Sequence, residues 1–155
     1  MPATVLVLAD RLDIAALIGR SLAGVGLRPA VVSDLRQAAL VMARETPAAV
    51  VLDLAAPGHC DAVVRWLRRD PKGAAIAVVQ VSALARNGGA PRGEMRADLH
   101  LPKPFTPRQI VDGVRTVLAR RAARERFRAG ATPLTASVRD STGMRHDLVV
   151  AAERR

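Results

Sequence analysis

The sequence predicts an α/β fold, a doubly wound five-stranded parallel sheet with helices on both faces. Two patterns along residues 4–120 carry this prediction. Short apolar runs without polar alternation recur, which is typical of strands buried on both faces. Between them lie longer segments whose apolar residues repeat with the helical period. Because strands and helices alternate, the strands are expected to run parallel, joined by right-handed helical crossovers.

The elements can be placed in order from local signals. Strands are expected at residues 4–8, 30–32, 49–52, 76–81 and 99–101, and helices at 12–22, 35–44, 62–69 and from 107 onward. Pro71 is expected to end the third helix, because the residue before a proline avoids helical geometry. Thr106, Pro107 and Gln109 form a capping box that opens the last helix. The glycines and proline of residues 87–93 predict a loop, followed by at most a short helix at 94–97.

The length of 155 residues leaves room for one ordinary domain and an appendage. Residues 1–121 are expected to form the domain, and residues 122–155 a basic, Ser/Thr-containing C-terminal extension. The last helix is expected to continue to Arg128 with a basic face. After Gly130 two alternatives stay open: a flexible tail, which this composition favours, or a hairpin or helix that docks on the domain or on a partner.

The chain is basic, with 24 Lys and Arg against 14 Asp and Glu and a net charge of +10. One interpretation is a codon bias that favours arginine together with alanine and valine. The other is an electrostatic preference for an anionic partner, such as an acidic protein face or nucleic acid. Aromatic residues make up only 2% of the chain, which argues against base stacking on single strands. Nucleic acid is therefore not an expected partner.

The cellular location can also be predicted. Cys60 is the single cysteine, so it cannot form an internal disulfide and fits a reducing compartment. No apolar run approaches the roughly 18 to 20 residues that cross a bilayer, and no basic leader precedes the first strand. A cytoplasmic location without membrane contact is expected.

Polar side chains follow four of the expected strands where they end. Asp10 and Asp53 end the first and third strands, Ser82 ends the fourth, and Lys103 follows the fifth. Ligands of open parallel sheets bind at this edge, so the four side chains are expected to converge. Carboxylates hold Mg²⁺ through oxygen, and an ammonium and a hydroxyl suit phosphoryl oxygens. A carboxylate can itself be the nucleophile, so the set predicts phosphoryl transfer.

Two nucleotide-binding motifs of α/β folds are absent from the sequence. Residues 9–13 (ADRLD) stand where a dinucleotide site needs G-x-G-x-x-G, and no G-x-x-x-x-G-K-[ST] occurs. Nucleotide binding is therefore not expected.

Residues 4 to about 120 resemble the receiver domain of bacterial response regulators, whose fold is that of the chemotaxis regulators. Three segments carry the resemblance: residues 50–58 (VVLDLAAPG), 78–83 (VVQVSA) and 101–105 (LPKPF). The last is the most specific, because Lys-Pro-Phe before a capped helix is a hallmark of that family. The resemblance implies a flavodoxin-like receiver fold with strand order 2-1-3-4-5.

The resemblance also implies roles for individual residues. Asp53 would be the phospho-acceptor and Lys103 the phosphate partner. The carboxylates of Asp10 and Asp53 and the backbone carbonyl of Ala55 would bind Mg²⁺. The Lys103–Pro104 peptide bond would be cis, which only an X-Pro bond allows at low cost.

The resemblance also implies a switch, and several residues depart from the family pattern. Ser82 would be the switch hydroxyl, and His100 stands at the aromatic switch position, where it is polar and titratable. Ala9 replaces one of two adjacent acids, so Mg²⁺ is expected to bind weakly. Arg11 places positive charge beside the pocket, which repels a metal but can partly substitute for it near a phosphoryl group. Glycines interrupt the fourth helix of the family.

The expected function is a stand-alone response regulator receiver of a two-component phosphorelay. It would be a phosphoprotein that accepts a phosphoryl group on Asp53 and signals through protein contacts, not an enzyme, although Mg²⁺-dependent self-phosphorylation from a phosphodonor fits. Its expected partners are a sensor histidine kinase or phosphotransfer protein and a downstream protein target. The alternative is a degenerate pseudo-receiver that acts as a phosphorylation-independent interaction scaffold.

Overall fold

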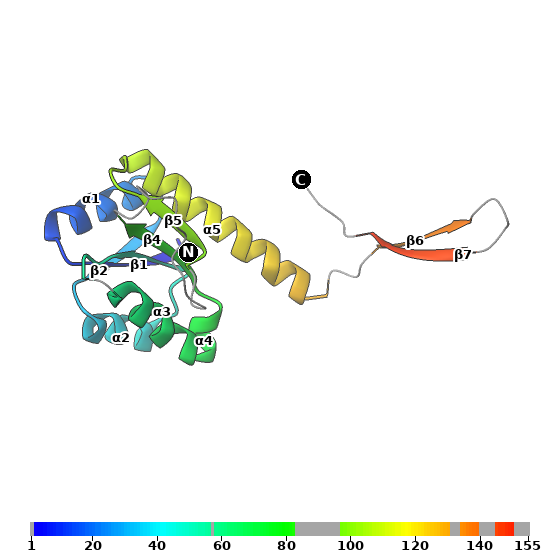
Figure 1. The fold of residues 1–155 in the computed structure, drawn as a ribbon, viewed down its shortest axis with the longest axis horizontal. Coiled ribbons are helices and arrows are strands. Elements are labelled where there is room, and N and C mark those ends of the chain that lie inside the picture. The colour runs from blue at the N-terminus through cyan, green and yellow to red at the C-terminus, as the bar shows by residue number, and fades with distance from the viewer. Residues whose placement is uncertain (1, 57, 83–96, 131–133, 140–144, 151–155) are drawn as a thin grey trace. The chain divides into compact units, whose positions relative to one another are not determined.

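The computed structural model describes residues 2–56, 58–82, 97–130, 134–139 and 145–150. The chain divides into two compact units, Met1–Ala122 and Ala123–Arg155. The first unit contains a five-stranded sheet of order β2-β1-β3-β4-β5 in which every pair of neighbours is parallel (Figure 1). The predicted fold class and strand order are therefore confirmed.

Apart from α4, the helices and strands up to residue 128 follow the predicted order. The strands are β1 (Thr4–Ala9), β2 (Arg28–Val32), β3 (Ala49–Asp53), β4 (Ala77–Ser82) and β5 (Leu99–Pro102). The helices are α1 (Leu12–Ala23), α2 (Leu35–Arg44), α3 (His59–Arg69), α4 (Pro71–Ala74) and α5 (Pro107–Arg128). The predicted loop and short helix before β5 fall almost wholly on residues 83–96, which lie outside the described residues.

The region around α3 and α4 differs from the prediction in two ways. Helix α3 begins at His59 rather than at residue 62, directly after Gly58, whose φ of 77° is a conformation that favours glycine. Pro71 does more than end α3, because it is also the first residue of the short helix α4. The carboxylate of Asp70 caps that helix by accepting a hydrogen bond from the Lys72 N–H at 2.8 Å.

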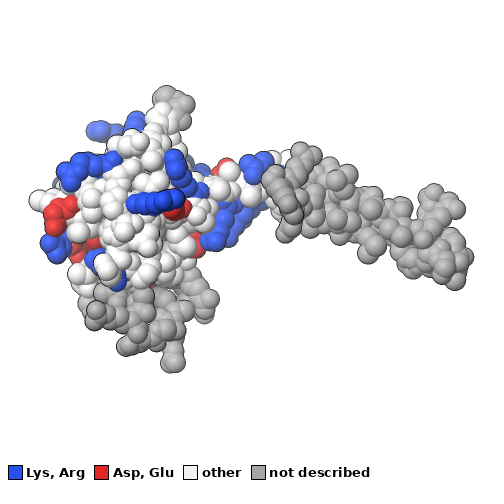
Figure 2. All heavy atoms as spheres, turned by 90° about the horizontal axis from the view of Figure 1, so that it is seen from above, with Lys and Arg blue, Asp and Glu red and all other residues white. Residues whose placement is uncertain are grey.

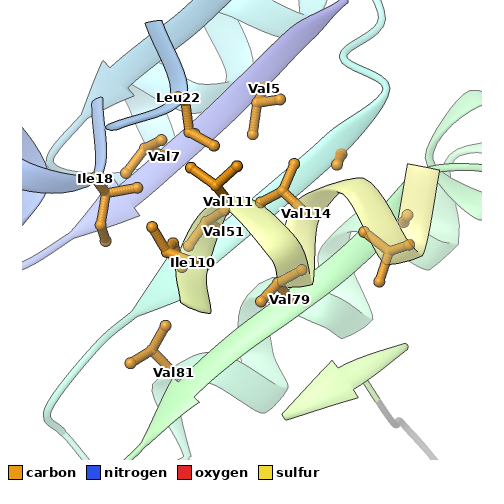
Figure 3. Close-up of a cluster of buried hydrophobic side chains, with 13 residues drawn as sticks. Val5, Val7, Ile18, Leu22, Val51, Val79, Val81, Ile110, Val111 and Val114 are labelled. Atoms are coloured by element: carbon orange, nitrogen blue, oxygen red, sulfur yellow. The ribbon is translucent and has the colours of Figure 1, made fainter. Parts of the chain in front are cut away.

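The sheet is buried on both faces by two layers of helices. Figure 1 shows α1 and α5 on one face of the sheet and α2 and α3 on the other. Alternate residues of β1 point to opposite faces, so Val5 and Val7 join the first layer, and Leu6 and Leu8 the second. Figure 3 shows the first of these layers, whose labelled members are Val5, Val7, Ile18, Leu22, Val51, Val79, Val81, Ile110, Val111 and Val114.

An arginine that the sequence analysis did not single out ties α3 to the sheet. Arg68 Nη1 donates to the carbonyls of Gly73 at 2.9 Å and Ile76 at 2.7 Å, and Nη2 pairs with Asp98 at 3.5 Å. The Asp98 carboxylate also accepts from the Val78 N–H at 2.7 Å. Both charged side chains are less than a quarter exposed. The network therefore joins the end of α3 to the starts of β4 and β5.

The second unit contains a two-stranded antiparallel sheet of β6 (Leu134–Arg139) and β7 (Arg145–Val150), with Leu134 opposite Val150. Residues 134–139 and 145–150 therefore pair as a hairpin, whereas docking of this hairpin on the domain or on a partner stays a prediction. Whether residues 122–155 are mobile stays a prediction. Among the described ranges, no helix combines the length and the apolar character needed to cross a bilayer.

We predict that Gly73→Ala strongly destabilises the fold. A Cβ at this position would lie 1.8 Å from the carbonyl oxygen of Leu67, and backbone atoms can yield only by moving α3. The loss is expected to be about 3 kcal/mol or more in the free energy of unfolding, measured by urea denaturation. Gly24→Ala is the control, because its φ of −62° is helical and its closest contact would be 3.4 Å. Equal stability of the two variants would contradict the structure.

Candidate functional site

The carboxyl edge of the sheet brings the predicted site residues together. In the pairing of β1 with β3, Ala9 lies opposite Asp53, and the Asp10 N–H donates to the Asp53 carbonyl at 3.2 Å. The Lys103 N–H donates to the Ser82 carbonyl at 3.0 Å, which continues the ladder between β4 and β5. Since β3 and β4 are neighbours, the ends of four strands meet at one edge.

The central contact of the site is an ion pair between Lys103 and Asp53. Lys103 Nζ lies 2.6 Å from Asp53 Oδ1. The Asp53 side chain is only 6% exposed, and that of Lys103 is 35% exposed. A buried carboxylate is costly unless a charge and hydrogen bonds compensate it, and the Lys103 ammonium provides that charge. The pair holds a carboxylate and a cation at hydrogen-bond distance, with the cation on the solvent side.

The loop after β5 carries Lys103, and the predicted switch residues lie on β4 and β5. The Lys103–Pro104 peptide bond is cis, as the resemblance implied. Ser82 is half-buried at the end of β4. His100 is exposed on β5 and lies opposite Gln80, two residues before Ser82 along the neighbouring strand. The structure thus brings Ser82 to the same edge as Lys103 and leaves His100 at the surface of the edge strand.

The predicted metal ligands also meet at this edge. One carboxylate oxygen of Asp10 accepts a hydrogen bond from the Ala55 N–H at 2.6 Å, which attaches the loop after β3 to the end of β1. Within the described residues no group of three or more His, Cys, Asp and Glu side chains could hold a metal. The donors present are two carboxylates and the carbonyl of Ala55. This all-oxygen set fits Mg²⁺, which keeps several waters and needs few protein ligands.

Arg11 is directed away from the role that the sequence suggested for it. Its guanidinium forms two hydrogen bonds to Asp13, at 3.1 Å from Nε to Oδ1 and at 2.7 Å from Nη2 to Oδ2. The Asp13 pKa is lowered from its ordinary value, first because of these hydrogen bonds. Sequence analysis missed this pair, although an acid two residues after an arginine at a helix start is a readable signal. The Arg11 charge is therefore paired with Asp13 at the exposed surface.

Cys60 lies next to the site without joining it. Its thiol is buried, 4.0 Å from the Leu54 carbonyl that follows β3. Burial is the main cause that raises the pKa of the Cys60 thiol, and the carboxylates of Asp61, Asp53 and Asp10 act in the same direction. The neutral thiol is therefore favoured, as in a packed side chain and unlike a reactive cysteine.

Comparison with known proteins shows what this site resembles. No family model matches the chain. The phosphate regulon transcriptional regulatory protein PhoB of Pseudomonas aeruginosa is 29% identical over 119 residues, which make up 76% of this chain and 52% of that protein. The chain therefore spans about half the length of this curated relative.

Solved structures match nearly end to end. A sensor protein from Polaromonas sp. JS666 has a TM-score of 0.67 and 28% identity, covering 77% of this chain and 98% of that one. The chemotaxis response regulator CheY4 of Vibrio cholerae has a TM-score of 0.67 and 18% identity, over 76% of this chain and 99% of its own. A third match is the receiver domain of the sensor histidine kinase PA1611 from P. aeruginosa, whose structure has magnesium coordinated in the active-site cleft. Its TM-score is 0.65 and its identity 20%, and the match covers 77% of this chain and 99% of that one.

The fold, the edge of the sheet and these comparisons place the chain in one class of protein, the signalling modules of two-component systems. The chain is similar in sequence and in fold to receiver domains of the response regulator family. Members of this family are phospho-acceptor modules rather than catalytic enzymes.

We predict that Asp13 titrates below its ordinary value and that Arg11 is the cause. A lowered pKa in the folded state means that the charged form is favoured, so any stability it adds is present above the unfolded pKa and lost as the pH falls through the folded one. The side-chain carboxyl carbon of Asp13, followed by NMR between about pH 2 and 7, should show the low midpoint. Arg11→Ala should raise it, and Arg20→Ala, on the same helix, should not. An unchanged midpoint in Arg11→Ala would contradict the pairing.

Proposed function

We propose that this receiver accepts a phosphoryl group on Asp53 and passes the signal on through protein contacts. The observation that supports the proposal best is the 2.6 Å ion pair between Lys103 Nζ and Asp53 Oδ1 at the carboxyl edge of the sheet. It provides a carboxylate nucleophile and, beside it, the cation that the incoming charge requires.

The proposed step is a displacement at phosphorus. Since Lys103 pairs with Oδ1, the Oδ2 oxygen of Asp53 attacks the phosphorus atom of the donor. A new O–P bond forms, the bond from phosphorus to the leaving group breaks, and the leaving group keeps the electron pair. The product, an acyl phosphate, brings additional negative charge to the edge. Lys103 would then pair with a phosphoryl oxygen, and the Ser82 hydroxyl would donate a hydrogen bond to another.

Magnesium belongs to the same proposal. Asp10, Asp53 and the carbonyl of Ala55 would hold the ion, which supplies neutralisation of the phosphoryl charge when bound. For that, the hydrogen bond from the Ala55 N–H to Asp10 can stay in place, because it uses one carboxylate oxygen and leaves the second to the ion. Ala9, a small apolar residue with 1% exposure, offers no further ligand.

The partners follow from the chemistry and stay proposals. The donor would be a sensor histidine kinase or a phosphotransfer protein, and the recipient of the signal a downstream protein. PA1611, one of the structural matches, is itself a sensor histidine kinase with a receiver domain. The cytoplasmic location expected from the sequence also stays a prediction.

A second candidate is an interaction scaffold that works without phosphorylation. Two observations favour it: Asp53 is only 6% exposed beneath Lys103, and the described residues offer Mg²⁺ only two carboxylates. If the metal binds too weakly at physiological concentrations, Asp53 would not be phosphorylated at a useful rate.

We predict that acetyl phosphate with Mg²⁺ labels the chain once, at Asp53. Mass spectrometry should show the addition of one phosphoryl group, labile to hydroxylamine as an acyl phosphate is. Asp53→Asn should abolish the label because an amide is not the nucleophile, and Asp61→Asn, a half-buried acid on α3, should keep it. Lys103→Ala should slow labelling by about tenfold or more. No label under forcing conditions would defeat the proposal.

We predict that Mg²⁺ binds the unphosphorylated chain with a roughly millimolar dissociation constant, as expected for a site with few charged ligands. Amide shifts of Asp10 and Ala55 in a Mg²⁺ titration would measure it. Asp10→Asn should weaken the binding by about tenfold, whereas Asp34→Asn, at the N-cap of α2, should not change it. Absent binding together with partner binding that survives Asp53→Asn would favour the scaffold.

A further inference from the structure

A groove between α2 and α3 lies apart from the phosphoryl site. It has a volume of about 540 Å³ and is lined on the α2 side by Ala39, Met42 and Ala43 and on the α3 side by Trp66 and Leu67. Trp66 is half-buried and is the single tryptophan of the chain. It comes seven residues after the first residue of α3, roughly 10 Å along the helix, and the phosphoryl site lies at the start of that helix. The groove therefore belongs to the opposite end of the domain.

The floor of the groove is apolar and continues along α2. Leu35, Ala39 and Met42 follow one another at spacings of four and three residues, so they form one stripe along the helix. Leu35 is 37% exposed, so it extends this apolar surface to the start of α2. The stripe spans about two helical turns, the length over which an apposed helix makes its apolar contacts.

The rim of the groove carries positive charge. Arg69 and Lys72 line it and are exposed. The third charged lining residue, Asp70, uses its carboxylate to cap α4 at the Lys72 N–H. That cap involves only the backbone of Lys72, so the side chain of Lys72 takes no part in it. A ligand in the groove would therefore meet an apolar floor beside two cations and one carboxylate that is bonded to the backbone of α4.

This charge decides which occupant fits. A second copy of the chain, at a net charge of +10, would bring cations to a cationic rim. Residues 123–155 hold seven arginines against four acidic residues, so the extension of this chain is no better matched. Basic side chains are also more widespread than acidic ones on the face shown in Figure 2. The complement must be acidic and come from another protein.

We propose that the groove between α2 and α3 binds an acidic amphipathic helix of a partner protein. Apolar side chains of that helix, three and four residues apart, pack onto Trp66 and Met42. Tryptophan is a frequent hot-spot residue of interfaces, and the flexible methionine side chain adapts to its partner. Carboxylates on its flank pair with Arg69 and Lys72. Binding here requires neither Mg²⁺ nor phosphorylation of Asp53, so the receiver would have a second contact surface that works in both states.

The experiment uses Trp66 as its own reporter. A synthetic helical peptide of about 18 residues, with Leu on one face and Glu on the other, is titrated into the full chain. A matched peptide has Lys in place of every Glu. The acidic peptide should shift the Trp66 emission to shorter wavelength, and the basic peptide should bind about tenfold more weakly.

Two double variants separate charge from folding. Arg69→Glu with Lys72→Glu should weaken the acidic peptide by about tenfold and invert the preference between the peptides. Arg36→Glu with Arg65→Glu is the control, because both arginines are exposed on the same two helices and neither lines the groove. It should leave the preference as in the wild type.

Three results would overturn the proposal. The peptides could bind equally well, which would mean that the rim does not select charge. The second result is that neither peptide binds at concentrations up to about 1 mM, a dissociation constant that corresponds to only about 4 kcal/mol of binding free energy. Sedimentation could show dimers that the Arg69→Glu, Lys72→Glu variant abolishes, which would assign the groove to a second copy of the chain.

Discussion

The ion pair between Asp53 and Lys103 is the interaction on which the site depends. A carboxylate that is 6% exposed at the end of β3 needs a cation, and the nearest one comes from the chain after β5. A hydrogen bond from the Lys103 N–H to the Ser82 carbonyl fixes the backbone of the segment after β5, which also contains the cis Lys103–Pro104 peptide bond. The same pair that satisfies a buried charge therefore also prepares a nucleophile beside a cation, so stability and proposed chemistry share one contact.

The parallel sheet explains why such a contact can exist at all. In a doubly wound sheet the carboxyl ends of all strands lie at one edge, and the loops that follow them are the only parts near enough to meet. The hydrogen bond from the Ala55 N–H to Asp10 holds two of these loops together. The two helical layers have different surfaces: α1 begins beside the site, whereas α2 and α3 leave an apolar groove with basic side chains at its rim. One small domain can therefore offer two separate surfaces for contact.

The motifs predicted more of the site than of its surroundings. Asp53 and Lys103 were found because Asp53 ends an expected strand and Lys103 closely follows another, and this position implies the carboxyl edge of the sheet. Arg68 was missed because its partners, three backbone carbonyls and Asp98, lie in segments that come together only in the folded domain. Pro71 was read as a stop signal alone, although a proline that ends one helix can also begin the next. The pair of Arg11 and Asp13 was also missed, although the two residues lie close together in the sequence.

What the sequence determined by itself is the order of the elements, the class of fold and the residues at the ends of the strands. These follow from local periodicity, which depends only on neighbours along the chain. Tertiary structure alone decided that Asp53 is buried under Lys103, that Arg11 turns to Asp13 and that Met42 and Trp66 border one groove. Each of these depends on distances between side chains on separate elements or on the rotamer of one side chain. Such distances are set by the packing of whole layers, and no local pattern in the sequence encodes them.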